Sequence, residues 1–198
     1  IRDDLVTGVQ TCSLPISSKG KSFYNVQIGS TASGGTLTTA DDISVDGNLT
    51  VGSIGTTVFD ISNETVTMSG SLWDLTNLDT FTITNSNVTF DVGGNTVTSA
   101  LLTYDVITVT NTGTTTFSDG FTSFDFLDTT ANSGLLFNAG STYTVTNTLN
   151  LKNVTIQSSS PPTRFAFSVT GSQYVRFTSV NNSEVNSGDI VGIFSTEN

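Results

Sequence analysis

The sequence lacks histidine entirely and contains a single cysteine, Cys12, among its 198 residues. Without histidine, neither a Ser-His-Asp nor a Cys-His catalytic group can form, and no metal can be held by imidazole. One cysteine cannot build a disulfide framework within the chain. No apolar run approaches the length of a membrane-spanning helix, so we expect no membrane insertion in this segment.

Positive charge is also scarce. Six Lys and Arg residues stand against 17 Asp and Glu residues, which gives a net charge of −11. Nucleic acids and anionic membranes are bound through clustered Lys and Arg, so neither is expected as a partner. Charged residues make up only 12% of the chain, and Thr, Ser, Asn and Gly supply the polar surface instead. We interpret the acidic balance as a solvated exterior that resists association.

The sequence is rich in a short triplet of apolar, polar and apolar residues. The clearest run spans residues 143–156, where Tyr-Thr-Val, Leu-Asn-Leu and Val-Thr-Ile are separated by small polar residues. The outer two side chains of each triplet share one face, as in a strand with one buried side. No window shows the i, i+3, i+4 spacing of an amphipathic helix. The chain is therefore predicted to be all-β.

Two all-β architectures fit this pattern. In a right-handed parallel β-helix, or β-solenoid, the chain winds in coils of about 20 residues and like residues stack on successive coils. In a β-sandwich, antiparallel strands are joined by hairpins. The recurrence of the triplet, the rarity of Asn-Gly hairpin turns and the many Thr, Ser and Asn residues favour the β-solenoid. The β-sandwich remains the alternative, since residues 100–127 could form antiparallel strands.

Residues 1–17 do not share the triplet pattern, although they contain Cys12 and Pro15. The run from Leu5 to Ile16 resembles translated sequencing-adapter read-through. We therefore expect 1–17 to be a non-native or disordered leader that packs poorly or is extended. Residues 18–198 are expected to form a single β-solenoid domain, truncated at its C-terminal end and part of a longer polypeptide.

Carboxylates are the first candidates for chemistry, because polysaccharide lyases and glycoside hydrolases would be the natural enzymes on such a fold. Asp125 and Asp128 flank a strand end, but their spacing places the side chains on opposite faces. We interpret them as turn and surface aspartates. Asp41, Asp42 and Asp46 could offer oxygen ligands to calcium, although this segment matches neither an EF-hand loop nor a Gly-rich calcium repeat.

Three further residues could contact sugars. Arg176 alternates with apolar neighbours and is expected on an outer face, where it could grip a sugar acid. Trp73 and Tyr174 could stack against sugars, although a single Trp in this pattern more often fills the core. None of these residues forms a constellation, so the sequence assigns no catalytic, cofactor-binding or metal-binding residue and no cofactor.

Several segments resemble a repeat of large bacterial surface proteins from environmental genomes. They are residues 23–28, 137–151, 154–162, 167–171 and 174–183. The resemblance is specific in order over about residues 115–185, and it departs from the usual pattern at Pro162, where Gly is common. It implies a β-solenoid, adhesin-like segment of a long extracellular polypeptide, with no assigned catalytic residues.

The expected function follows from this resemblance and from the absence of a catalytic pattern. We expect a non-catalytic structural or adhesive repeat segment, a rod or presentation scaffold, in a secreted or surface-anchored bacterial protein. Its place would be extracellular or at the cell surface, and its partner a surface glycan or a protein. The alternative is a carbohydrate-active or glycan-binding β-helix module.

Overall fold

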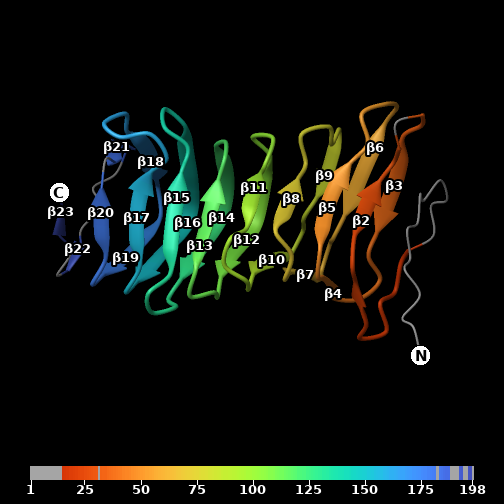
Figure 1. The fold of residues 1–198 in the computed structure, drawn as a ribbon, viewed down its shortest axis with the longest axis horizontal. Coiled ribbons are helices and arrows are strands. Elements are labelled where there is room, and N and C mark those ends of the chain that lie inside the picture. Colours follow the sequence, from red (N-terminus) through yellow and green to blue (C-terminus); the bar gives the residue numbers. More distant parts are fainter. Residues whose placement is uncertain (1–14, 31, 182, 188–191, 194–195, 198) are drawn as a thin grey trace.

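The computed structural model describes residues 15–30, 32–181, 183–187, 192–193 and 196–197. In this part the chain forms strands and no helix, and the strands wind into a β-solenoid of about 7 turns. Figure 1 shows the coils stacked along the long axis, from β3 near one end to β23 at the other. The predicted parallel β-helix is confirmed.

Three parallel sheets form the walls of the solenoid. The first has the order β1 (Ser22–Phe23), β4 (Ile43–Val45), β7 (Thr65–Met68), β10 (Asn87–Phe90), β12 (Thr103–Val109), β14 (Phe121–Asp128), β16 (Thr142–Lys152), β18 (Phe165–Val169) and β21 (Ser183–Ser187). In addition, β19 (Ser172–Arg176) pairs with β16 and with β22 (Gly192–Ile193).

The second sheet has the order β2 (Val26–Ile28), β5 (Asn48–Val51), β8 (Leu72–Asp74), β11 (Thr96–Thr98), β13 (Thr114–Phe117), β15 (Gly134–Phe137), β17 (Thr155–Ser158), β20 (Ser179–Asn181) and β23 (Thr196–Glu197). The third contains β3 (Gly35–Thr38), β6 (Thr57–Asp60) and β9 (Thr80–Thr82).

The β-sandwich alternative is wrong. All pairings between the described strands are parallel. This includes β12 and β14, the stretch that the sequence left open for antiparallel pairing. Parallel pairing requires a crossover between partners, and here one full coil provides it.

The cross-section changes along the stack. The third sheet ends at β9, and after the 4-residue β10 the next first-sheet strands are longer, with 7 residues in β12, 8 in β14 and 11 in β16. The Tyr104 ring at the start of β12 packs against Phe81 of β9 with centroids 5.2 Å apart. The lengthened strands thus continue the wall that the third sheet forms in the first coils.

A single hydrophobic core runs through the stack from Ile28 to Val175. The Phe117 and Phe137 rings stack at 5.2 Å with an interplanar angle of 14°. Trp73 is fully buried, and its indole N–H donates to the Tyr104 hydroxyl at 3.1 Å. This confirms that Trp73 fills the core, because its one polar group is satisfied internally. Burial of each such ring stabilises the fold by about 1.5–3 kcal/mol.

The predicted leader is described only in its last residues, and residues 1–14, including Cys12, lie outside the described part. Ile16 forms a parallel bridge with Thr39. Its amide donates to the Thr38 carbonyl at 2.7 Å, and its carbonyl accepts from the Ala40 amide at 2.8 Å. The predicted truncation at the C-terminal end stays a prediction.

Candidate functional surface

Five aspartates bind the backbone of a neighbouring coil. Asp41 accepts hydrogen bonds from the Ser17 hydroxyl and the Ser18 amide, both at 2.7 Å, and these bonds lower the Asp41 pKa. Asp79 accepts from the Thr57 amide at 2.8 Å, which lowers its pKa in the same way. The remaining pairs join Asp42 to Thr65, Asp105 to Ser86, and Asp119 to Ser99 and Ala100. These carboxylates satisfy amides at the corners, where the sheet ladders end.

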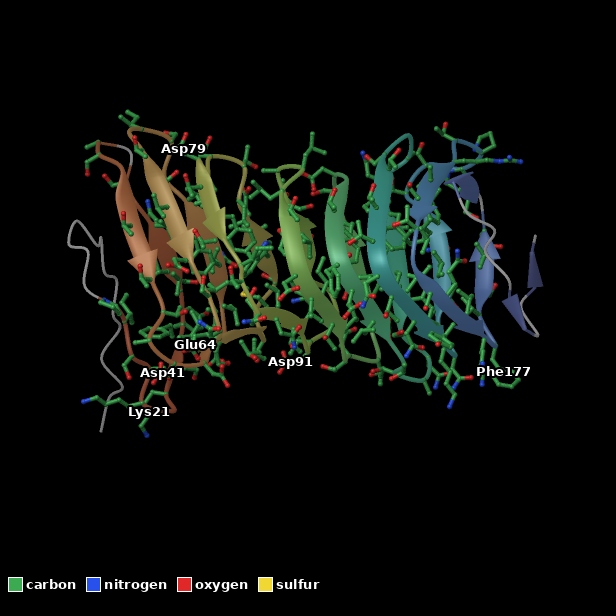
Figure 2. All side chains as sticks on the ribbon, turned by 180° about the vertical axis from the view of Figure 1, so that it is seen from behind. Lys21, Asp41, Glu64, Asp79, Asp91 and Phe177 are labelled. Atoms are coloured by element: carbon green, nitrogen blue, oxygen red, sulfur yellow. The ribbon has the colours of Figure 1, made fainter. Side chains whose placement is uncertain are left out.

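The aspartates considered as calcium ligands do not converge. Asp41 and Glu64 lie on one edge of the stack (Figure 2), and desolvation and the charges of Asp42 and Asp41 raise the Glu64 pKa. Asp46 lies at the other end of β4, where it accepts from the Ser22 hydroxyl at 2.6 Å. Within the described residues, no group of three or more His, Cys, Asp or Glu side chains is placed to hold a metal.

Asp125 and Asp128 lie on opposite faces of β14, as their spacing predicted. Asp125 is half-buried on the outer face, and its carboxylate accepts from the Asn147 side-chain amide at 2.8 Å. The interpretation of both as turn and surface aspartates is right only in part for Asp128: it does bind its own turn, accepting from the Thr130 amide at 3.1 Å, but it is fully buried and not on the surface. Its carboxylate accepts from the Ser133 hydroxyl at 2.6 Å, and burial raises its pKa to about 6. The two carboxyls therefore cannot act together on one substrate.

A polar groove follows one corner of the first coils. Its floor contains Gly47, Gly70 and Gly93, and its volume is about 450 Å³. A Cβ on Gly70 would lie 1.6 Å from the Gly47 carbonyl oxygen, so close stacking of the coils already requires glycine there. Tyr24, which is 64% exposed, and Asp46 line the groove. The groove is open and polar, which suits a hydrated ligand better than an apolar one.

A second surface combines basic and aromatic side chains on the outer face of the C-terminal coils. Lys152 of β16 and Arg176 of β19 are register partners, and both are exposed. Tyr174, two residues before Arg176 and on the same face, is 49% exposed, whereas Val175 between them is buried. We call Lys152, Tyr174, Arg176 and the adjoining Phe177 the basic-aromatic surface. Phe177 is 52% exposed.

The sequence identified part of this surface. It placed Arg176 on an outer face, which is confirmed, and it named Tyr174 as a candidate platform for sugars. It missed Lys152, which is separated from Arg176 by a full coil and meets it only through the register of β16 and β19. A search for like residues at the coil spacing would have aligned the two cations.

Comparison with known proteins assigns no activity to either surface. No family model matches the chain, and no curated protein or solved structure shows significant similarity to it. In the described part of the chain, no helix is long and apolar enough to cross a membrane.

Proposed function

We propose that this chain is a non-catalytic structural or adhesive segment of a secreted or surface-anchored bacterial protein. In this role it acts as a rod that spaces or presents a neighbouring module outside the cell. The observation that carries the proposal is the continuous core from Ile28 to Val175, which joins all the intervening coils into one body. A stack with one uninterrupted core bends and frays less than separate domains on linkers.

The exterior supports the same role. The outward positions of its strands carry mainly Thr, Ser and Asn. Cross-strand pairs of such side chains stabilise neighbouring strands without creating an exposed apolar patch. The resemblance of residues 115–185 to segments of bacterial surface proteins supports an extracellular location. The expected partner is a glycan or a protein on another surface.

Limited proteolysis and small-angle scattering of the whole chain test the rod. Chymotrypsin cuts after aromatic residues, and most of the aromatic side chains here are buried in the core. We expect the region from Ile28 to Val175 to survive digestion as one fragment, and the scattering profile to fit an elongated body. Rapid cleavage between coils, or a flexible scattering profile, would overturn the proposal.

The second candidate is a glycan-binding or carbohydrate-active module, and the polar groove beside Tyr24 favours it. Incubation with a panel of soluble polysaccharides distinguishes the roles. Binding without the release of reducing ends or unsaturated products fits a presenting or binding module. Release of such products would establish an enzyme and refute the non-catalytic proposal.

A further inference from the structure

Basic residues are distributed very unevenly along the chain. Between Ser22 and Leu151 the sequence contains twelve Asp and Glu residues and no Lys or Arg. The next bases are Lys152, Arg164 and Arg176. Two of these three, Lys152 and Arg176, are register partners on adjacent strands. The fold thus brings two cations together on one outer face, in a part of the chain (152–198) where three bases stand against three acids.

This pairing is unfavourable for the isolated protein. Adjacent strands lie about 4.8 Å apart, and like charges directly opposite each other in a sheet destabilise it. Among the residues whose side chains are described, no carboxylate forms an ion pair with Lys152 or Arg176. The nearest acid in the register is Asp128, the partner of Leu151, and it is buried in the core. An external anion would relieve this repulsion.

Phe177, which follows Arg176, has an unusual backbone conformation for a bulky residue. It has φ of 52°, in the left-handed region. Asn132, Asn153 and Phe177 hold equivalent turn positions in three successive coils. Backbone hydrogen bonds join these turns: the Asn132 amide donates to the Asn153 carbonyl, and the Asn153 amide donates to the Arg176 carbonyl. Asn132 and Asn153 are also left-handed, with φ of 67° and 59°.

Asn adopts this conformation readily, whereas a bulky residue does so at a cost. The equivalent position in the third coil is nevertheless Phe177, whose side chain is 52% exposed. Turn formation alone would favour Asn here as in the two coils before it. The ring therefore adds apolar surface beside Arg176, at the opposite end of the stack from Asp41 and Glu64 (Figure 2).

We propose that the basic-aromatic surface binds an acidic polysaccharide, one that bears carboxylate or sulfate groups. Lys152 and Arg176 would bind the anionic groups through charge-assisted hydrogen bonds. Tyr174 and Phe177 offer ring faces for the apolar side of the sugars, and Asn150, the register partner of Tyr174, offers an amide. The inference rests on the proposed presenting role, and it names the chemical class of the glycan partner.

A polymer fits this surface better than a small anion. Lys152, Tyr174 and Arg176 are all exposed on the outer face of neighbouring strands, so a single sugar would bind weakly, and affinity would come from many units on one chain. The acidic coils repel a polyanion elsewhere along the rod, which directs it to this end. Nucleic acid is also bound by neutralising several of its charges with Lys and Arg, so single-stranded DNA is a competing outcome of the test.

Biolayer interferometry of the whole chain tests the proposal. The probes are immobilised polygalacturonate for carboxylate, heparin for sulfate and dextran as the neutral control, with polyglutamate and single-stranded DNA as competing polyanions. We expect binding to one or both acidic polysaccharides that weakens with added salt, and none to dextran. Absence of binding to both at low salt, or tighter binding to polyglutamate or DNA, would overturn it.

Variants locate the site. Lys152→Gln combined with Arg176→Gln should weaken binding by at least about tenfold, because charge-assisted bonds are the strong ones. Phe177→Asn should also weaken binding while the melting temperature stays equal or rises, which a purely structural role would not give. Arg164→Gln, at an exposed base in another loop, is the matched control and should bind within about twofold of the native chain.

Equal losses for the control and the double variant would show general charge attraction and refute the site. The protease resistance of the same samples reports on the rod separately. Failure of the polysaccharide site is thereby distinguished from failure of the scaffold.

Discussion

Replacement of Asp128 by Asn should stabilise the protein at neutral pH and not at acidic pH. Asp128 is 0% exposed, and its hydrogen-bond donors are the Ser133 hydroxyl at 2.6 Å and the Thr130 amide at 3.1 Å. Neither donor carries a charge. Burial outweighs these hydrogen bonds and raises the carboxyl pKa from 3.8 to about 6.

The direction of the pH effect follows from this raised pKa. Between about pH 4 and pH 6 the folded protein holds a proton on Asp128 that the unfolded chain releases, so stability falls as the pH rises through this window. Two pKa units correspond to about 3 kcal/mol. Charges inside proteins are partly screened even where they are buried, so we expect a loss of about 1–2 kcal/mol at pH 7.

Urea denaturation at pH 4 and at pH 7 measures the effect as a difference between the variant and the native chain. Asp128→Asn should be about 1–2 kcal/mol more stable than the native chain at pH 7 and no more stable at pH 4. Asp125→Asn, on the outer face of the same strand, is the control and should show no such pH-dependent gain. If Asp128→Asn is less stable than the native chain, and by the same amount at pH 7 as at pH 4, the reasoning is refuted.

Three further predictions concern the stack. Gly70→Ala should cost more than about 3 kcal/mol in a urea melt, because its Cβ would meet the Gly47 carbonyl; a native-like melt would disprove this close approach. Phe137→Ala should cost about 3–5 kcal/mol and Phe137→Leu clearly less, because this ring packs against Phe117 and Tyr143 in the core; equal costs would argue against a cavity. Added NaCl should raise the melting temperature, because the net charge of −11 repels itself and salt screens it; a fall in melting temperature would contradict this.

The sequence predicted the strands and the class of fold because both follow from local pattern. Val66-Thr-Met68 and Val88-Thr-Phe90 lie within β7 and β10, and their apolar residues are buried as the triplet requires. Short strands with polar spacers leave little room for any structure except narrow coils. The end of the third sheet at β9 was not predicted, because it depends on how rings from different coils pack together.

The candidate surfaces were predicted less well, because they depend on register between coils. The bond from Thr57 to Asp79, and the meeting of Lys152 with Arg176, join residues that are far apart in the chain. The left-handed corner at Phe177 becomes informative only beside its equivalents in the preceding coils. Burial of Asp128 was missed because the spacing from Asp125 shows which face it occupies and not how tightly the turn closes over it.

The regular register of successive coils has a consequence for how such a chain can change over generations. Val66 and Val88 occupy the same place in successive coils. An in-frame deletion of 66–87 would therefore place Val88 against Ile43, where Val66 now lies, and a duplication of the same stretch would add another Gly70. Gains and losses of length are thus tolerated in whole coils, whereas a change of a few residues in a strand shifts side chains to the wrong face. Recombination between neighbouring coils can lengthen or shorten the rod while its cross-section is inherited unchanged.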